Sequence, residues 1–432
     1  MNKRHKFNRR AFLKTSIASL TTLTILPRHV LGGAGFTPPS EMLTRAVIGT
    51  GGMGMGHVTG INTACKLLAV CDVDEKHLQT ALKTVATKPG GEDVKGYRDF
   101  REVLARKDID IVHVPTPPHW HALISIAAAK AGKDIWCEKP MSRTIAEGEA
   151  VKAAMAKYKR IFRLNTWFRF QGGFYGMEVP VKPIKKVVQA GILGWPLKVT
   201  LGGMTGFDWK QNAWCGRTGL MPQPVPPELN YDFWLGPAPF KPYHPHRVHQ
   251  TFRGYWDYDG GGLGDMGQHY LDPVQYLLGK DDESPVQIEA DTGPQDRDAV
   301  LPWRRISLRY ADGCEIILDG ENKDTAPFLS GPKGHLTKAL ESDIPEIKEK
   351  IKDLPDPAPQ LTDFVKAVKT RQKFALNEIN GHRSCTLVNL AKIAVETGRP
   401  LRFDSKKQRF IDDKEANSYV QQPMRSPWKI KG

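Results

Sequence analysis

Lys139, Asp265 and His269 are the side chains in this sequence whose types and spacing could carry out chemistry. The ordinary pKa of imidazole lies near working pH, so His269 can take a proton from an alcohol. Lys139 directly precedes Pro140 at an expected strand end, where its ammonium group can stabilise charge on an oxygen atom. Asp265 and His269 are four residues apart and share one face of a helix, so Asp265 can orient the imidazole or bind a hydroxyl. Together they suit the oxidation of a secondary alcohol.

A glycine-rich turn predicts where a redox cofactor binds. An expected strand at 45–49 runs into a helix through the pattern G-x-G-x-x-G. These glycines permit a tight turn and a close approach of backbone to a pyrophosphate, which then rests on N–H groups at the helix N-terminus. The residues expected to form this cradle are Gly49, Gly51, Gly52, Met53 and Gly54.

Asp72 ends the next expected strand and makes the cradle more specific. A carboxylate at that position can accept hydrogen bonds from both ribose hydroxyls of NAD, and it repels the 2′-phosphate of NADP. The alternative is a glycine-rich turn with a capping aspartate and no ligand. We expect NAD as the cofactor.

The alternation of apolar runs and helical stretches from Thr44 onward predicts an α/β domain with a doubly wound parallel (Rossmann) sheet. The runs that we expect to be its strands are 45–49, 66–71, 109–114, 133–137 and 160–164. A second domain of the α+β type is expected around a large, mostly antiparallel open sheet. Its expected strands are 197–202, 286–290, 304–310, 314–319 and 399–403, with a hairpin turn at 311–313.

These patterns predict five parts of the chain: a targeting segment at 1–34, an extended arm at 35–43, the Rossmann domain at 44–163, a substrate and oligomerisation domain at 164–405, and a tail at 406–432. Within the second domain, residues 360–398 are expected to pack back on the Rossmann domain, and 333–358 to form an exposed, charged insertion. Pro273 lacks the N–H that would bond the His269 carbonyl, so a kink or helix end is expected there.

The order of the motifs resembles the glucose–fructose oxidoreductase/inositol dehydrogenase (Gfo/Idh/MocA) family from about Arg45 to Phe403. The motifs are the glycine turn, Asp72, Thr116-Pro117-Pro118 with His121, Glu138-Lys139-Pro140, and the run from Gly264 to His269. The resemblance implies that Thr116, Pro117 and His121 line the cofactor and that Glu138 contacts the nicotinamide ribose. It also implies that Lys139 lies beside the substrate carbon, with Asp265 and His269 reaching it from the second domain.

Candidate substrate contacts follow the Rossmann strands and crowd the segment before the catalytic helix. Asn165 and Arg169 stand where the family has a substrate-facing strand end, and both can bind hydroxyls. Aromatic faces stack on the C–H faces of sugar rings, and an arginine offers a polar edge. On this basis Tyr231, Arg253 and Trp256 are predicted to contact a sugar or glycoside, the alternative being that the aromatic residues only pack a loop-rich region.

The net charge of +15 does not predict nucleic-acid binding. Residues 1–34 carry seven basic and no acidic side chains, which leaves 55 basic against 47 acidic residues elsewhere, without a clustered stripe. We expect no metal site, although one built from Asp265, His269 and Asp272 is an alternative. The six cysteines show no metal-binding or paired spacing.

The N-terminal segment predicts export. Asn8-Arg9-Arg10-Ala11-Phe12-Leu13-Lys14 resembles a twin-arginine motif, and the apolar run after it is too short for a permanent membrane span. A solvated basic tail is the alternative. We therefore expect a periplasmic or otherwise exported protein, and a homo-oligomer with 35–43 as an arm across its interface.

Export limits the function, because no free NAD pool is expected outside the cytoplasm. The first hypothesis is an NAD-dependent oxidoreductase that acts on a sugar, glycoside or polyol, retains its cofactor and is reset by a second carbonyl substrate. The second is a redox-neutral, NAD-dependent glycoside hydrolase that proceeds by oxidation, elimination, water addition and reduction. The third is a sugar-binding protein without turnover, against which the presence of Lys139, Asp265 and His269 counts.

Overall fold

The computed structural model describes residues 41–60, 64–166, 168–170, 179–202, 214–321, 323 and 325–430. The predicted twin-arginine segment and most of the predicted arm at 35–43 lie outside these residues. Among the helices described, none is both long and apolar enough to cross a bilayer.

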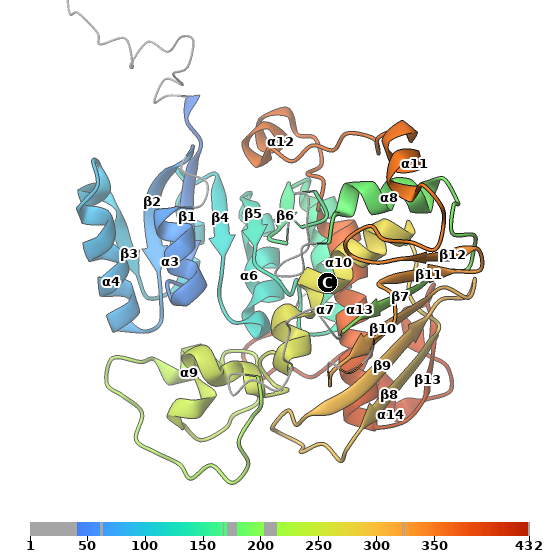
Figure 1. Ribbon diagram of the computed structural model, residues 1–432. Coiled ribbons are helices and arrows are strands. Elements are labelled where there is room, and N and C mark those ends of the chain that lie inside the picture. The colour runs from blue at the N-terminus through green and yellow to red at the C-terminus, as the bar shows by residue number, and fades with distance from the viewer. Residues whose placement is uncertain are drawn as a thin grey trace, which may run out of the picture. The chain divides into compact units, whose positions relative to one another are not determined.

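The first domain contains a six-stranded parallel sheet in the order β3-β2-β1-β4-β5-β6 (Figure 1). Its strands are β1 (Thr44–Ile48), β2 (Lys66–Cys71), β3 (Lys95–Tyr97), β4 (Ile111–Val114), β5 (Asp134–Cys137) and β6 (Phe162–Leu164). The central strands β4 and β5 are buried along their whole length, as expected of strands covered on both faces. The strand order reverses between β1 and β4, the place where ligands bind in doubly wound sheets. The sequence prediction missed β3, an edge strand of three residues without an apolar run.

Helices connect these strands, and their ends follow local sequence signals. They are α3 (Gly52–Thr59), α4 (Glu75–Ala86), the short η2 (Gly91–Asp93), α5 (Phe100–Ala105), α6 (Pro118–Lys130) and α7 (Ile145–Tyr158). Asp74 caps α4 by accepting a hydrogen bond of 2.8 Å from the Lys76 N–H, and Thr144 caps α7 through the Glu147 N–H. Pro118 begins α6, a position where its missing N–H has no intrahelical partner.

The second domain contains an eight-stranded sheet in the order β12-β11-β7-β10-β9-β8-β13-β14. Its strands are β7 (Lys198–Leu201), β8 (Gln287–Thr292), β9 (Trp303–Arg309), β10 (Glu315–Asp319), β11 (Leu329–Gly331), β12 (Gly334–Leu336), β13 (Leu401–Asp404) and β14 (Arg409–Phe410). Neighbouring strands are antiparallel except β7 and β10. The two sheets confirm the predicted fold class.

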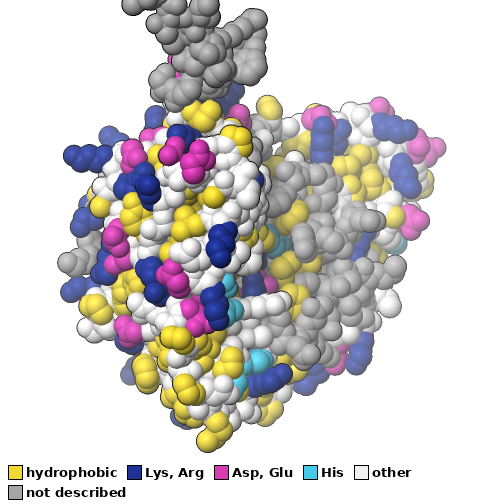
Figure 2. All heavy atoms as spheres, turned by 90° about the vertical axis from the view of Figure 1, so that its left-hand side faces the viewer, with side chains coloured by type: hydrophobic (Ala, Val, Ile, Leu, Met, Phe, Trp, Pro, Cys, Tyr) yellow, Lys and Arg dark blue, Asp and Glu magenta, His cyan; other side chains and the backbone are white. Residues whose placement is uncertain are grey.

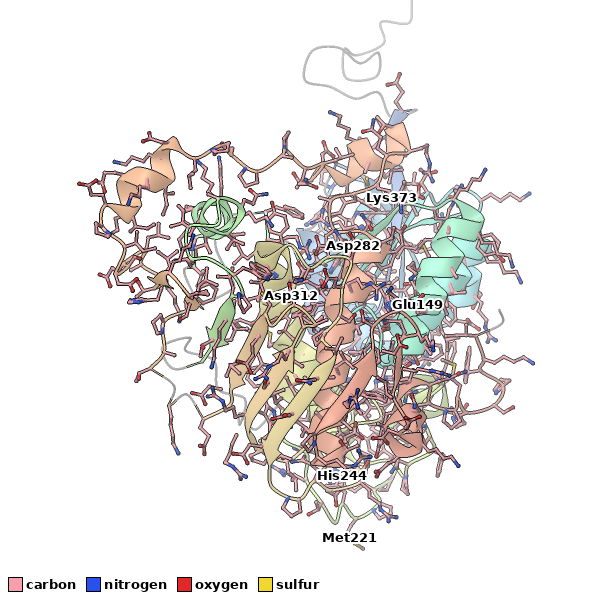
Figure 3. The ribbon with its side chains drawn as sticks, turned by 90° about the vertical axis from the view of Figure 1, so that its right-hand side faces the viewer. Glu149, Met221, His244, Asp282, Asp312 and Lys373 are labelled. Carbon is pink, nitrogen blue, oxygen red and sulfur yellow. The ribbon has the colours of Figure 1, made fainter. Side chains whose placement is uncertain are left out.

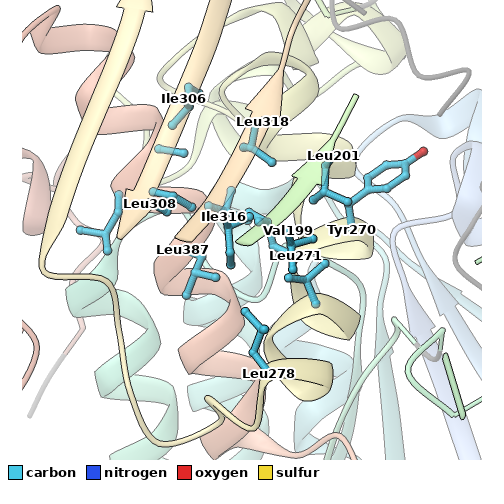
Figure 4. Packing of buried hydrophobic residues seen from close by; sticks show 14 of the residues in the cluster. Val199, Leu201, Tyr270, Leu271, Leu278, Ile306, Leu308, Ile316, Leu318 and Leu387 are labelled. Carbon is cyan, nitrogen blue, oxygen red and sulfur yellow. The ribbon is translucent and has the colours of Figure 1, made fainter. Parts of the chain in front are cut away.

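The helices of the second domain are α8 (Val181–Gln189), α9 (Tyr231–Leu235), η3 (Pro245–Arg247), η4 (His249–Gly254), α10 (Gly261–Leu278), α11 (Ile347–Asp353), α12 (Phe364–Thr370), α13 (Glu378–Thr397) and α14 (Lys414–Val420). Helices α10 and α13 pack on each other, and α13 also contacts α7, β8 and β9. Figure 4 shows the resulting core, where Leu271 of α10 and Leu387 of α13 face Val199, Leu308 and Ile316 of the sheet. These two helices therefore fix the second sheet against the first domain.

Helix α10 continues through Pro273 to Leu278, so the predicted helix end at this proline is wrong. The residues beyond it, Val274, Leu277 and Leu278, are buried in the main core. Burying three apolar side chains contributes several kcal/mol, which offsets the hydrogen bond lost at the proline (about 1 kcal/mol).

Residues 364–397 lie against the first domain. The Leu164 N–H of β6 donates a 3.1 Å hydrogen bond to the Leu376 carbonyl, and the rings of Trp136 and Phe364 are 5.3 Å apart. Arg371 forms an ion pair with Asp134 at the start of β5. This segment, which follows β12 in sequence, thus closes the far edge of the Rossmann sheet.

The residues after 405 belong to the second domain and are not a separate tail. Strand β14 pairs with β13, and the buried rings of Phe403 and Phe410 are 5.2 Å apart. Farther on, the Trp428 ring lies 4.7 Å from that of Trp120 on α6. The predicted insertion at 333–358 likewise contains β12 and α11, because short apolar stretches such as the buried Ile347 and Ile351 add to the core.

Charge on the face drawn in Figure 2 is mixed in sign, with Lys and Arg side chains interspersed among Asp and Glu. Ion pairs among the described residues include Arg101 with Asp99 and Arg106 with Asp108. Figure 3 shows Met221 and His244 of the loop-rich segment 214–258 at the opposite end of the view from Asp282 and Lys373. That segment contacts the connection between β8 and β9 through the Gly216 N–H, which donates to the Val300 carbonyl.

The first prediction tests whether the C-terminal strand is part of the domain. Phe410→Ala should lower the free energy of unfolding by about 3–5 kcal/mol, because it leaves a cavity beside Phe403. Urea unfolding followed by far-UV circular dichroism measures this change. The neighbouring Ile411, which is 42% exposed, provides the control Ile411→Ala, for which little change is expected. Equal stability of the two variants would contradict the assignment of β14 to the core.

Candidate active site

The glycine turn between β1 and α3 is tightly packed inside and open outside. Gly49 has φ of +96°, a conformation that favours glycine. A Cβ atom on Gly54 would lie 2.0 Å from the Gly49 carbonyl oxygen, whereas one on Gly52 would meet nothing within 4 Å. A Cβ atom on Gly51 would touch only the His77 ring, at 3.8 Å, and Met53 is 51% exposed. The outer side of the turn therefore has room for phosphate groups.

Asp72 follows β2 and holds the turn from the side. Its Oδ2 accepts hydrogen bonds from the N–H (2.7 Å) and the hydroxyl (3.1 Å) of Thr50, and its Oδ1 accepts one from the Asp74 N–H at 2.9 Å. A carboxylate oxygen has two acceptor positions, so Oδ1 keeps one for a ribose hydroxyl. Asp72 is placed as predicted, with less free accepting capacity than the sequence suggested.

The loop after β4 contains Thr116 and Pro117, and it lies against the glycine turn. A Cβ atom on Gly49 would be 3.1 Å from the Thr116 nitrogen. The Thr116 hydroxyl is buried without a hydrogen-bond partner among the described residues, so a donor and acceptor is left for a ligand. Pro117 is the N-terminal cap residue of α6.

His121 is almost fully buried and connects two loops of the site. Its Nδ1 lies 2.6 Å from the Pro140 carbonyl oxygen and its Nε2 lies 2.6 Å from the Thr116 carbonyl oxygen. Burial lowers the pKa of His121 despite these two acceptors. The ring thus bridges the loops that contain Thr116 and Pro140, and its lining of the cofactor, which the resemblance implied, stays a prediction.

Glu138 follows β5 and lies in a buried polar network. Its Oε1 accepts hydrogen bonds from His57 Nε2 (2.7 Å) and from the Asn165 side-chain amide. The His57 Nδ1 is in turn 2.9 Å from His113 Nδ1. Burial alone would raise the pKa of Glu138, but the His57 hydrogen bond and the positive charge of Lys139 outweigh it and hold this pKa below its ordinary value.

Sequence reasoning missed His57 and His113. A carboxylate only accepts, so His57 Nε2 donates to Glu138, while a second hydrogen bond joins His57 Nδ1 to His113 Nδ1. His113 interrupts the apolar strand β4, and a polar residue inside a buried strand was the available signal. Asn165 belongs to this network, while its own side-chain carbonyl is buried without a partner among the described residues.

Lys139 and Asp265 meet across the two domains as predicted. The Lys139 ammonium group donates to the Asp265 carboxylate at 2.7 Å and to its backbone carbonyl at 2.6 Å. Arg253 Nε lies 2.8 Å from the other carboxylate oxygen, to which the Trp214 indole N–H also donates at 2.8 Å. Burial would raise the pKa of Asp265, but the charges of Lys139 and Arg253 lower it far below its ordinary value. The carboxylate is therefore always ionised.

His269 lies one turn after Asp265 on α10 and is also buried. Its Nδ1 is 2.9 Å from the hydroxyl oxygen of Thr166, which follows β6. Burial, and then the positive charge of Lys139, lower the pKa of His269 to about 3. The imidazole is thus neutral and able to accept a proton, although its pKa is not near working pH as the sequence suggested.

Asp259 is a further buried carboxyl group that sequence reasoning did not single out. Neither of its oxygens has a hydrogen-bond partner among the described residues. Burial, and then the negative charge of Asp265, raise its pKa to about 7. Asp259 precedes the glycines that begin α10, and a Cβ atom on Gly264 would lie 2.3 Å from its Oδ1.

Three of the predicted substrate residues, Arg169, Tyr231 and Trp256, form hydrogen bonds or ion pairs within the protein. Arg169 is buried, with its guanidinium group paired to Asp272 (2.6 Å and 2.7 Å) and to Asp281 (2.7 Å). The Tyr231 hydroxyl donates to the Lys241 carbonyl inside an aromatic cluster of its own loop. The guanidinium group of Arg169 and the hydroxyl of Tyr231 already have partners within the protein, so they are poorly placed to bind a sugar.

Trp256 lies in the main core, and its indole N–H donates to the Asp296 carbonyl at 3.1 Å. Arg253 and Trp214 are residues of the loop-rich segment that reach Asp265. Asp272, which the alternative metal site would use, is instead paired with Arg169.

Comparison with known proteins agrees with this geometry. Residues 43–166 match the oxidoreductase family NAD-binding Rossmann fold, and residues 177–430 match the oxidoreductase family C-terminal alpha/beta domain. The chain belongs to the Gfo/Idh/MocA oxidoreductase family. The first domain of this Gfo/Idh/MocA protein is therefore an NAD-binding domain, which confirms the cofactor prediction.

Relatives of this Gfo/Idh/MocA chain have several names. Inositol 2-dehydrogenase of Salmonella paratyphi B is 29% identical over 161 residues, which are 36% of this chain and 44% of that protein. A glycosyl hydrolase family 109 protein of Shewanella pealeana is 30% identical over 161 residues, which are 33% of this chain and 35% of that protein. The matches thus span less than half the length of these curated relatives.

The structure of this Gfo/Idh/MocA protein is similar to that of the WlbA dehydrogenase from Bordetella pertussis, solved in complex with NADH and UDP-GlcNAcA. The TM-score is 0.57 at 16% identity, covering 84% of this chain and 99% of that chain. At this identity the similarity concerns the fold.

The residues at the carboxyl edge of the first sheet fit a nicotinamide dinucleotide. The open side of the glycine turn suits the diphosphate, and Asp72 Oδ1 suits a ribose hydroxyl. The unpartnered hydroxyl of Thr116 and side-chain carbonyl of Asn165 are buried polar atoms at the ends of β4 and β6. Such atoms cost stability unless a ligand or water satisfies them.

The second prediction compares two glycines of the turn. Gly54→Ala should lower both Tm and NAD affinity, because its Cβ atom collides with the rigid Gly49 carbonyl. Gly52→Ala should keep the Tm, since its Cβ atom has open space, and should weaken NAD only through the volume lost on the ligand side. Differential scanning fluorimetry and NAD titration measure the two effects. The turn geometry would be refuted by a normal Tm in Gly54→Ala.

The third prediction concerns pH. The folded pKa of Asp259, about 7, is above its ordinary value of 3.8, so the folded state loses stability as pH rises through about 7. The Tm should therefore fall between pH 5 and pH 8, and Asp259→Asn should flatten this slope because the ionisation is gone. Asp291→Asn, at an exposed position, serves as the control and should leave the slope unchanged. A slope that is identical in Asp259→Asn would remove the carboxyl group as its cause.

Proposed function

We propose that this protein is an NAD(H)-dependent oxidoreductase that moves a hydride to or from a secondary hydroxyl or carbonyl group of a sugar, glycoside or polyol. The observation that carries the proposal is the meeting of Lys139 from the NAD-binding domain with Asp265 and His269 from one face of α10. A polyhydroxylated substrate is supported by the relative named inositol 2-dehydrogenase and by the structural neighbour bound to NADH and UDP-GlcNAcA.

Each side chain of the site has its own role in the proposed reaction. Bound NAD supplies the hydride acceptor or donor. His269 takes the proton of the reacting hydroxyl, and Thr166 fixes the orientation of its ring through Nδ1. The ammonium group of Lys139 stabilises negative charge on the reacting oxygen. Asp265 holds this ammonium group in place and, together with Arg253, provides polar groups for neighbouring substrate hydroxyls.

Glu138 and Asn165 are side chains of the proposed site that we expect to contact the cofactor. Glu138 stays ionised and is held in one orientation by His57 and Asn165, so that it can accept from a ribose hydroxyl of the cofactor. Burial of this network keeps water from competing for these hydrogen bonds. The roles of all these side chains rest on their placement and on the family resemblance.

A second candidate function is the redox-neutral hydrolysis of a glycoside. It is favoured by the glycosyl hydrolase family 109 relative, which is 30% identical to this chain over 161 residues. In this reaction the oxidised ring carbon acidifies the adjacent C–H bond, the glycosidic substituent is eliminated, water adds, and the hydride returns. The same three side chains would serve the oxidation and the final reduction.

Export, cofactor retention and a homo-oligomer remain predictions. Retention follows from export, because an exported enzyme that released NADH would stop after one turnover. The sheet face that includes Arg304 and Asp291 is charged, so an oligomer built on it would have a polar interface.

The fourth prediction tests the proposed function. Lys139→Met and His269→Asn should each lower kcat at least about 100-fold while NAD still binds, because they remove charge stabilisation and the base. The exposed Lys406→Met is the control and should turn over normally. The assay follows nicotinamide absorbance and product with free sugars, polyols and glycosides, with and without a carbonyl acceptor.

Deuterated solvent separates the two reactions. An oxidoreductase requires the acceptor and leaves the neighbouring carbon unlabelled, whereas the hydrolase proceeds without it and exchanges deuterium into that carbon. Saturable sugar binding without any turnover would make the protein a binding module. Normal rates in both Lys139→Met and His269→Asn would overturn the proposed site.

A further inference from the structure

Asp74, His77 and His249 form a group of metal-ligand side chains outside the active site described above. Each offers one ligand atom, and the three atoms lie within 4.8 Å of one another. Asp74 is the N-terminal cap of α4, His77 is in the first turn of that helix, and His249 begins η4 of the second domain. Two imidazoles and one carboxylate are the donor types that zinc prefers.

Asp74 has one carboxylate oxygen in use and one that faces the histidine. Its Oδ1 caps α4 by accepting from the Lys76 N–H at 2.8 Å and from the His77 N–H at 3.4 Å. Its Oδ2 lies 3.3 Å from His249 Nε2. Two ligand atoms at about 2.0–2.1 Å from a tetrahedral zinc ion are separated by roughly 3.3 Å, so this pair is already at the spacing that an ion requires.

His77 is the third ligand, and it is next to the predicted cofactor carboxylate. Its ring centroid is 4.7 Å from that of His249, with an interplanar angle of 64°. Its Nδ1 lies 3.8 Å from Asp72 Oδ2. Asp72 therefore adds negative charge near His77 without a hydrogen bond to it.

The backbone at His249 is in an uncommon conformation. Its φ is +55°, in the left-handed region that residues other than glycine seldom adopt, at a cost on the order of 1 kcal/mol. This conformation occurs at the start of η4, where the chain turns the imidazole toward Asp74. A strained residue that presents a ligand-type side chain indicates a function for that side chain.

The segment that contains His249 is held against α4 by contacts of the same loop region. The Asn230 N–H donates to the Val73 carbonyl and the Glu75 N–H donates to the Glu228 carbonyl, both at 3.0 Å. Lys76 also forms an ion pair with Glu228. These contacts bring the ligands from the two domains together before any ion binds, which lowers the entropy cost of binding.

We propose that Asp74, His77 and His249 bind a divalent transition-metal ion, with zinc as the ion that best fits two imidazoles and a carboxylate. Water fills the remaining position of the coordination sphere. No covalent or redox step is involved. The ion connects η4 to α4 and so closes the loop region 245–254 beside Asp72.

The position of this ion gives it a consequence for the cofactor, which rests on the proposed function. Asp72 is where the adenosine ribose of NAD is expected, so a metal that clips η4 to α4 would slow the release of NAD. Such a clip suits an enzyme that retains its cofactor between turnovers. Metal binding itself does not depend on this role.

The fifth prediction measures zinc binding directly on the full chain after removal of metals with a chelator, in the absence of NAD. Isothermal titration with Zn²⁺ should show one site per chain. His249→Ala and His77→Ala should each weaken it at least about tenfold, since each removes one ligand of three. His249 is 41% exposed as a side chain, so its replacement should leave the Tm nearly unchanged.

His335→Ala is the matched control, because His335 is 38% exposed and lies 3.2 Å from Asp343 without a second histidine nearby. It should bind zinc like the wild type. Absence of one-to-one binding, or equal affinity in wild type and His249→Ala, would overturn the site. These outcomes concern the metal alone, so they leave the oxidoreductase proposal standing.

The proposed slowing of NAD release by the metal is tested by measuring the release rate with and without Zn²⁺, in wild type and in His249→Ala. Slower release that depends on Zn²⁺ and on His249 supports it. If zinc binds but the rate of NAD release does not change, the proposed effect of the metal on the cofactor is refuted and the metal site itself stands. A chain that binds zinc but not NAD would instead refute the proposed function.

Discussion

The buried contact between Lys139 and Asp265 is the interaction on which the site depends. Lys139 follows a strand of the NAD-binding domain and Asp265 is on a helix of the second, so their pairing sets the distance between cofactor and base. A buried ion pair is not by itself a source of stability, since the cost of desolvation offsets much of the attraction. Its value here is specificity: a charged side chain left without its partner is strongly unfavourable, so the two domains have one preferred arrangement.

Burial also explains the protonation states around this contact. One environment raises the pKa of Asp259, lowers that of Asp265 and lowers that of His269, because each group responds to desolvation and to different neighbouring charges. A cation beside a carboxylate keeps the carboxylate charged, and the same cation keeps a nearby imidazole neutral. The result is an ammonium group and a neutral imidazole within one buried site.

The loop-rich segment before α10 has a different role from the one its composition suggested. Its aromatic rings form a packing cluster around Tyr231, Trp234 and Tyr258, and this cluster holds the segment against the end of the Rossmann sheet. The same packing carries Arg253 to Asp265 and His249 to Asp74. A surface of aromatic residues can thus position a few polar side chains without contacting a substrate.

The sequence by itself determined the fold class, the glycine turn, Asp72, and the membership of Lys139, Asp265 and His269 in one motif set. The fold class, the glycine turn and Asp72 depend on local patterns, namely apolar periodicity and a strand-to-helix turn. The grouping of Lys139 with Asp265 and His269 came from the resemblance of the motif order to the family. Short edge strands such as β3 and β14 could not be predicted from the sequence, because two or three residues carry too little periodicity.

Only the tertiary structure decided which polar side chains are engaged elsewhere. Arg169 is buried against Asp272, His57 and His113 join Glu138, and α10 continues past Pro273 because its end is packed in the core. The type and spacing of residues state what a side chain can do, whereas its partners depend on contacts between segments that are more than a hundred residues apart, such as Arg169 and Asp272. Such contacts leave no local pattern in the sequence.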